Sequence, residues 1–311
     1  MKTLMLNYPV TTLDGTELYA AGAELSEKTI QEARKQHPQP AGEYAYLLKH
    51  GSVFNDMLDM MSQPPYSAIY ANPADRDAVL ALMKNRRVQP IVLESLDYFR
   101  RKDIYTYRHA LMVFALSILL ARHLAVPGLD LEQEIMAAGP SHDLGKTSIP
   151  LSILSKSTAL TAEERRHLEH HTTAGFALLA WADGDMNAPA ARISRDHHER
   201  PDGTGYPAGK KLSDLLVEII AACDIYDALV SLRPYRSASF ENRTALEELT
   251  ELANNNYLSR EIIQSLVALN RRGRPSAQTC VVSMERRGTP PADNLYGVTI
   301  PEPVAPAPHK S

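Results

Sequence analysis

The sequence predicts a mainly α-helical fold that is preceded by a small α+β module. Between Tyr98 and Leu269, apolar residues recur with a period of about 3.6, which is typical of successive packed helices. Before residue 97 the pattern is mixed, and the end of the chain is rich in proline and poor in apolar pattern. We therefore expect a module at 1–96, a helical domain at 97–285 and a largely disordered tail at 286–311, with disorder after about Ile300.

The predicted module combines a hairpin with a helix. Asp14 and Gly15 stand between two short alternating segments, which is a hairpin signal. Ser26 then caps a helix that runs to about Gln36. Two later stretches, YSAIYAN at 66–72 and RVQPIVLE at 87–94, are strand-like. No ligand can be assigned to the module, so we expect a structural or regulatory role.

The helical domain contains stretches of helical pattern at 103–124, 161–182, 213–232 and 259–270. Thr161 begins one of them and Glu164 follows three residues later, which is a capping box. The longest apolar run, Ala110–Ala121, is shorter than the roughly 20 residues that span a bilayer. It therefore predicts a buried helix rather than a membrane anchor.

Composition places the chain among ordinary cytoplasmic proteins. The formal net charge is 33 − 37 = −4, so we expect no binding to a nucleic-acid polymer. The two cysteines, Cys223 and Cys280, cannot form a disulfide framework and are typical of the cytosol. The N-terminal residues lack the pattern of a secretion signal. Because the net charge is negative, an anionic substrate would have to bind where positive side chains are concentrated locally.

An adjacent histidine and aspartate stand in apolar surroundings, in IMAAGPSHDLGKTSIP. His142 and Asp143, if buried together, require polar partners. Neutral imidazole offers one nitrogen and a carboxylate can bridge two ions, so a divalent metal suits this pair. The simpler alternative is a His-Asp hydrogen bond near a helix end.

Further histidines favour the metal interpretation. His109 begins the apolar helix instead of lying on a polar face, and His171 falls on an apolar stripe. His167 and His170 are rivals on the same helix, and periodicity alone does not choose between 170 and 171.

One more carboxylate and a histidine pair complete the candidate cluster. Asp224 lies on the same helix face as Ile220 and Val217, where an unpaired carboxylate is rarely buried. Asp227, one turn later, is the alternative ligand. His197 and His198 are adjacent. Five histidines and two aspartates at interior positions on separate helices favour a metal cluster over isolated buried polar groups.

The histidine pair is followed by a stiff turn, in RDHHERPDGTGYP at 195–207. Helical neighbours point about 100° apart, so both imidazoles reach the ions only where the backbone leaves helical geometry. Gly203 and Gly205 permit positive φ, and Pro207 fixes the exit of the turn. This arrangement would present Tyr206 beside the metals.

Three motifs carry a family resemblance: HDLGKTSIP, HHERPDGTGYP and CDIYDALVSLRPYR. In order and separation they resemble the HD-GYP family, a branch of the HD phosphohydrolases, over roughly Ile104–Leu269. The resemblance implies an HD-type helical bundle and a metal-dependent phosphodiesterase. Its expected reaction is hydrolysis of cyclic di-GMP to linear pGpG, with GMP as a candidate further product, by a hydroxide held between two divalent ions.

The resemblance also implies roles for individual residues of this chain. It selects His171 over His170 and Asp224 over Asp227, and it gives the metal ligands as His109, His142, Asp143, His171, His197, His198 and Asp224. Asp143 would bridge the ions, and Lys146 would neutralise phosphate charge. The expected substrate contacts are Lys146, Gly205, Tyr206, Pro207, Arg233 and Arg236. Arg200 is a weaker candidate for such a contact and is expected to be solvated. Iron or manganese fits this ligand set best, and zinc is not excluded.

Two positions depart from the family pattern. Tyr105 stands where some members carry a glutamate that supports a third metal, so we expect two ions. Pro140 is expected to kink the helix just before the ligands.

Two other functions compete with the predicted cyclic di-GMP phosphodiesterase: a sensor or docking module for a cyclic dinucleotide, and hydrolysis of a different cyclic dinucleotide. Protein signalling partners or a homodimer are compatible with each.

Overall fold

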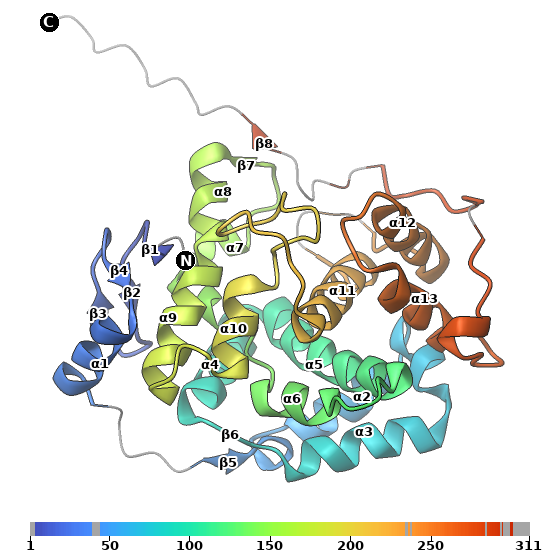
Figure 1. Cartoon of the computed structure of the whole chain (residues 1–311), viewed down its shortest axis with the longest axis horizontal. Helices are drawn as coiled ribbons and strands as arrows, with labels where there is room; N and C mark the ends of the chain where they lie inside the picture. Colours follow the sequence, from blue (N-terminus) through green and yellow to red (C-terminus); the bar gives the residue numbers. More distant parts are fainter. Residues whose placement is uncertain are drawn as a thin grey trace, which may run out of the picture.

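The computed structural model describes residues 4–38, 44–233, 236, 238–283, 285–292, 294 and 299–300. Helices dominate these residues and the strands are two or three residues long, as Figure 1 shows. The mainly α-helical prediction is therefore confirmed.

The N-terminal residues form the predicted hairpin and helix. The elements are β1 (Leu4–Met5), β2 (Val10–Thr11), β3 (Glu17–Tyr19), β4 (Glu24–Leu25) and α1 (Glu27–Gln36). Strands β2 and β3 pair antiparallel across the Asp14-Gly15 turn, where Gly15 has a φ of 89° that favours glycine. Ser26 caps α1 and forms a capping box with Thr29.

The second half of the predicted module is helical. Its elements are β5 (Ala45–Tyr46), η1 (Leu47–Lys49), α2 (Val53–Ser62), η2 (Tyr66–Ala71), α3 (Pro73–Asn85), β6 (Arg87–Val88) and α4 (Pro90–Lys102). The strand predicted at 66–72 is wrong, because Tyr66, Ile69 and Tyr70 share one buried face of the 3-10 helix η2. At 87–94 only Arg87–Val88 is a strand, since Pro90 begins α4 at a position where its fixed φ favours a helix.

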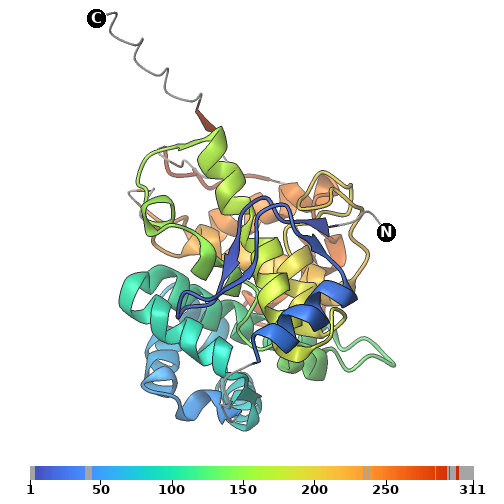
Figure 2. The same ribbon diagram turned by 90° about the vertical axis from the view of Figure 1, so that its left-hand side faces the viewer.

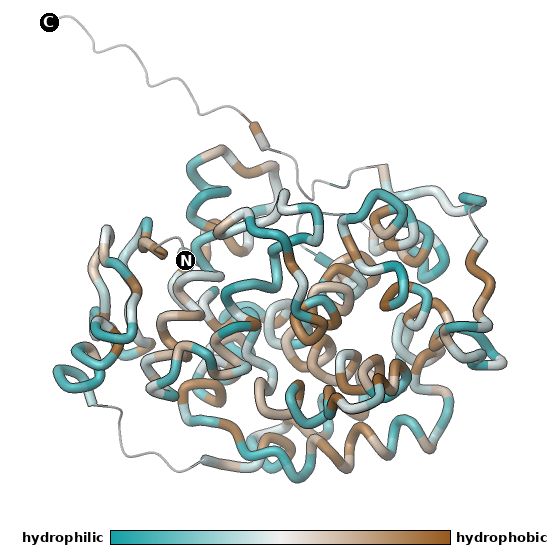
Figure 3. The backbone as a smooth tube through the Cα atoms, in the orientation of Figure 1, coloured by the Kyte–Doolittle hydropathy of each residue, from teal (hydrophilic) through white to brown (hydrophobic). Residues whose placement is uncertain are grey.

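One long helix, α5 (Ile104–Leu124), precedes the remaining elements. They are α6 (Leu131–Ala138), η3 (Leu144–Ser148), α7 (Leu151–Leu154), β7 (Leu160–Thr161), α8 (Ala162–Glu169), α9 (His171–Asp183), α10 (Pro189–Asp196), α11 (Leu215–Val230), α12 (Asn242–Asn254), α13 (Arg260–Leu269), η4 (Ala277–Thr279) and β8 (Thr299–Ile300). Helix α5 packs against α4, α6, α11 and α13. Figure 3 shows hydrophobic residues concentrated on these inner helices.

Helix α5 is longer than the apolar run that predicted it. By length and composition it is the one helix in the described part of the chain that could cross a membrane, but 83% of its apolar window is buried. Burial on all sides is typical of a core helix in a helical protein. The prediction of a buried helix is therefore confirmed, and its span agrees with the helical pattern at 103–124.

The two halves of the predicted N-terminal module contact different parts of the bundle. In Figure 2 the first strands and α1 lie against α9, and the Arg34 guanidinium donates to the backbone oxygens of Trp181 and Ala182. Helices α2, α3 and α4 instead pack against α5.

The domain limits remain a prediction. The disorder predicted after Ile300 lies outside the described residues.

Candidate metal centre

The HD motif lies on a turn between two helices. Helix α6 ends at Ala138, and Gly139 has a φ of 68°, a left-handed conformation that favours glycine. Pro140 follows without an amide hydrogen, so the chain leaves the helix there. The predicted kink is therefore wrong: the helix ends, and His142 and Asp143 follow on a non-helical turn that leads into η3.

The seven predicted ligands come from separate elements and meet in the interior. His109 lies on α5, His171 is the first residue of α9, and Asp224 lies on α11. His197 and His198 follow the end of α10. Each of the seven side chains is buried except that of His198, which is half-buried. The structure thus brings all seven together.

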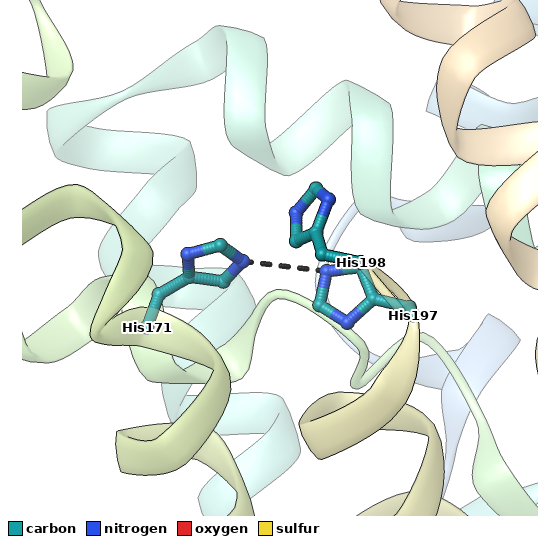
Figure 4. A group of neighbouring side chains, drawn as sticks. All are labelled: His171, His197 and His198. Atoms are coloured by element: carbon teal, nitrogen blue, oxygen red, sulfur yellow. Dashed lines mark hydrogen bonds between the residues drawn. The ribbon is translucent and has the colours of Figure 1, made fainter. Parts of the chain in front are cut away.

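The donors form two groups with Asp143 between them. The first group is His109, His142 and Asp224, and the second is His171, His197 and His198. Within each group the donor atoms lie within 4.8 Å of one another. Figure 4 shows the second group, with the His171 and His197 rings facing each other.

Asp143 faces the two groups with different oxygens. Its Oδ2 lies 3.3 Å from Nε2 of His109 and 3.5 Å from Nε2 of His142. Its Oδ1 lies 3.5 Å from Nε2 of His171 and 3.8 Å from Nε2 of His197. One carboxylate can therefore serve both groups, which is the arrangement that a bridging ligand requires.

Hydrogen bonds orient the imidazoles of the second group. Nδ1 of His171 lies 2.6 Å from the backbone oxygen of Leu168, and Nδ1 of His197 lies 3.0 Å from that of Ser194. Because a carbonyl only accepts, each Nδ1 carries the proton, and each Nε2 is left with a lone pair. Burial lowers the pKa of His171 to about 4 and that of His197 to about 3, so both rings stay neutral.

The two lone pairs of His171 and His197 point at each other. Their Nε2 atoms are 3.3 Å apart, and neither carries a proton to share. Two facing acceptors repel unless a cation lies between or beside them. The second group therefore fits a metal ion on its own geometry.

The first group is rich in negative charge. Burial and the neighbouring Arg233 lower the pKa of His109, but Asp227, Asp143 and Asp224 outweigh them and raise it to about 10. Burial raises the pKa of Asp143, yet Lys146 and His142 outweigh it and hold that pKa well below its usual range. The carboxylates here therefore stay ionised and favour a bound cation.

The rival residues lie outside the ring of donors. His170 is buried, but its Nδ1 lies 2.9 Å from Oγ1 of Thr173 and its ring meets that of Tyr8. Asp227 lies behind His109, with Oδ2 2.6 Å from Nδ1. A carboxylate in this position fixes the tautomer and orientation of a metal-binding histidine. The sequence offered Asp227 only as a rival ligand and missed this supporting position.

A cavity of about 380 Å³ opens over the two groups. This volume is within the usual range for small-molecule sites. Of the predicted substrate contacts, the cavity is lined by Lys146, Gly205, Tyr206 and Arg233. Nζ of Lys146 lies 2.5 Å from Oδ2 of Asp143, so this lysine is not a free surface residue.

Two predicted substrate contacts do not line this cavity. Pro207 is half-buried beside it. Arg236 is buried, and its Nη2 donates to the backbone oxygens of Ala228, Leu229 and Ser231. It therefore covers carbonyls that the end of α11 leaves without helical partners. The substrate contact predicted for Arg236 is corrected to this packing role.

The turn after the histidine pair is held by contacts that the sequence indicated only in part. Gly203 has a φ of 83°, as expected. Gly205 is needed for another reason, since a Cβ there would lie 2.2 Å from the backbone oxygen of His198. The ring of Tyr206 stacks on that of His198, with centroids 4.6 Å apart. Arg200 is not solvated as predicted; it lines the cavity and donates to the backbone oxygen of His197.

Glu199 is a supporting residue that sequence reasoning missed. Its side chain is fully buried, and its two oxygens accept hydrogen bonds from the amides of Ala208 and Lys210, at 2.7 and 3.0 Å. It therefore ties the histidine pair to the far side of the turn. No local pattern distinguishes it from a solvated glutamate, because both amides are nine or more residues away in sequence.

Glu199→Ala is expected to loosen this turn. Losing two charge-assisted hydrogen bonds should lower the free energy of unfolding by about 1–3 kcal/mol. Proteolytic cleavage between residues 200 and 212 should rise in parallel, as urea unfolding and mass spectrometry of the fragments can measure. Glu94→Ala, at an exposed position on α4, is the control. Equal stability and equal cleavage in the two variants would contradict this role.

Comparison with known proteins identifies a family and several relatives. Residues 87–262 match the family model described as HD domain. A cyclic di-GMP phosphodiesterase of Thermotoga maritima is 36% identical over 183 residues, which cover 58% of this chain and 49% of the relative. A cyclic di-GMP phosphodiesterase of Pseudomonas aeruginosa is 40% identical over 149 residues, which cover 47% of this chain and 36% of the relative.

A third relative is named for a different cyclic dinucleotide. The 3'3'-cGAMP-specific phosphodiesterase 1 of Vibrio cholerae is 32% identical over 139 residues, which cover 44% of this chain and 32% of the relative. The chain thus spans half or less of the length of each of these relatives. The family model covers more than half of the chain, and it includes all seven donors. The chain belongs to the HD domain family, as its HD and GYP motifs predict.

Proposed function

We propose that the chain is a metal-dependent phosphodiesterase that hydrolyses cyclic di-GMP to linear pGpG, with GMP as a further product. The observation that carries the proposal is the Asp143 carboxylate, which faces one donor group with each oxygen, next to a cavity that His109, His171 and Asp224 line. Two divalent ions, iron or manganese before zinc, would be held by the seven donors. When bound, they would supply an activated water and neutralise charge on the phosphate.

The residues around the cavity suit a doubly charged nucleotide. Positive side chains line it at Lys146, Lys156, Arg165, Arg200 and Arg233, against the acids Asp103, Glu169 and Asp224. We assign Lys146 to a phosphate oxygen, because this residue lines the cavity and its ammonium lies against Asp143. Lys156 and Arg165 were not predicted from the sequence; Lys156 follows the end of α7, and Arg165 lies on α8.

Aromatic and turn residues would receive the bases. Tyr206 is braced by His198 on one ring face, which leaves it suited to stack on a purine. Gly205 borders the same cavity. Arg233 lines it as well and contacts Asp227, so we assign it to a phosphate or a guanine.

The test is hydrolysis by anaerobically purified, metal-replete protein. We expect conversion of cyclic di-GMP to pGpG, followed by chromatography, with about two ions per chain by metal analysis. Protein with two ions that binds cyclic di-GMP without cleaving it would instead be a sensor. A cytoplasmic location, protein signalling partners and a homodimer remain predictions.

One relative supports a second substrate. Because the Vibrio cholerae protein is named as specific for 3'3'-cGAMP, that dinucleotide belongs in the assay beside cyclic di-GMP. The longer alignments to the two proteins named for cyclic di-GMP, over 183 and 149 residues against 139, favour the latter. A larger kcat/KM for 3'3'-cGAMP than for cyclic di-GMP would reverse the order.

A further inference from the structure

Tyr66 lies in η2, outside the matched residues 87–262, yet its side chain contacts Asp227, the residue behind His109. Its hydroxyl donates a hydrogen bond to Oδ1 of Asp227 and lies 2.7 Å from Oγ of Ser231. A phenol has one proton, and Tyr66 donates it to Asp227 in a hydrogen bond. The hydroxyl of Ser231 is therefore the donor in its contact with Tyr66. Both Tyr66 and Asp227 are buried.

Asp227 joins this hydroxyl to a candidate ligand. Its other oxygen, Oδ2, accepts from Nδ1 of His109 at 2.6 Å. His109 in turn points Nε2 at Asp224 and Asp143, at 3.0 and 3.3 Å. Tyr66, Asp227 and His109 therefore form a continuous chain of hydrogen bonds that ends among the first group of donors.

Each link of the chain depends on the one before it. A fully buried carboxylate needs donors on both oxygens, and Tyr66 supplies the donor on Oδ1. With Oδ1 held, the rotation of the Asp227 carboxylate is restricted, and Oδ2 is presented to the imidazole in one orientation. Nη2 of Arg233 lies 3.4 Å from the same Oδ2 and 2.9 Å from Nδ1 of His109, so it adds positive charge beside this link without replacing the contact to Oδ1.

We propose that Tyr66 is a positioning residue for the metal ion held by His109, His142 and Asp224. It acts through Asp227, which fixes the orientation and the basicity of His109. The metal centre is thus completed by a residue that precedes the matched family segment, from a 3-10 helix that was expected to be a strand. The catalytic consequence rests on the proposed function, whereas the effect on metal binding does not.

The same 3-10 helix contains a matched control. Tyr70 is 3% exposed, as deeply buried as Tyr66, and among the described residues its hydroxyl has no hydrogen-bond partner. Tyr66→Phe and Tyr70→Phe therefore remove the same atom from the same element. Only the first removes a link to His109.

The experiment measures Mn²⁺ binding to the full chain by competition with a chromophoric chelator. Tyr66→Phe should weaken the affinity for one of the two ions by about 10-fold, the size of effect typical for groups behind a metal ligand. The affinity for the other ion should stay unchanged, and Tyr70→Phe should match the wild type for both. With cyclic di-GMP as substrate, kcat should fall while KM stays the same.

A double variant separates this role from general packing. Asp227→Asn should weaken the affinity for the same ion. Adding Tyr66→Phe to this variant should not lower that affinity further, because both residues act through one chain of hydrogen bonds. Equal affinities in Tyr66→Phe and Tyr70→Phe, or equal weakening of both ions, would overturn the inference. If wild-type protein binds two ions but cleaves no cyclic dinucleotide, the proposed function fails while the binding data still decide the role of Tyr66.

Discussion

Asp143→Ala is expected to lose both metal ions and at least about 10³-fold in turnover of cyclic di-GMP. Removing a single preorganised group that stabilises charge costs about 10²–10³ in rate, and here one carboxylate faces both donor groups. The imidazoles of the second group would then surround a site without an anionic ligand. Metal analysis and product chromatography measure the two losses.

Asp143→Asn and a surface variant make this prediction specific. The amide keeps the shape of the side chain but not its charge, so the asparagine variant should retain the fold and still fail to hold two ions. Asp77→Ala, with a side chain that is 64% exposed, should match the wild type in metal content and turnover. Thermal unfolding reports on the fold of each variant. Turnover retained in Asp143→Ala would exclude the mechanism proposed here.

Gly145→Ala is expected to lower the free energy of unfolding by about 3 kcal/mol or more. A Cβ at this position would lie 1.9 Å from the backbone oxygen of His171 and 2.3 Å from the backbone nitrogen of Gly175. Both obstacles are backbone, so α9 must move away from η3. That movement separates His171 from Asp143, and the metal content should fall as well.

Gly273→Ala is the matched control. A Cβ there meets no atom within 4 Å, and the stability should change by no more than about 0.5 kcal/mol. Urea unfolding of metal-free protein isolates the packing effect, and metal analysis of replete protein reports the displacement of His171. If Gly145→Ala has wild-type stability and binds two ions, the added Cβ does not force α9 away from η3, and the prediction is wrong.

Local sequence predicted the features that local physics controls. The Asp14-Gly15 hairpin, the Ser26 and Thr161 caps and the burial of α5 all depend on residues within one element. The strand expected at 66–72 was wrong, because three buried residues spaced for a 3-10 helix outweighed a strand-like composition. The kink expected at Pro140 was wrong, because Gly139 ends the helix first.

Supporting roles could not be predicted, because each depends on residues distant in sequence. Glu199 is defined by amides nine and eleven residues away, and Tyr66 by a carboxylate 161 residues away. Arg236 carries the same charge as Arg233 and belongs to the same RPYR motif, but it donates to backbone carbonyls and does not line the cavity.

The sequence by itself determined which chemical groups are present and their order along the chain: five imidazoles and two carboxylates. Tertiary structure alone decided how they face one another. It set the two oxygens of Asp143 toward different groups, and it placed Asp227 behind His109. The physical reason is that orientation within a buried cluster depends on helix packing and on hydrogen bonds between elements, which a linear pattern does not contain.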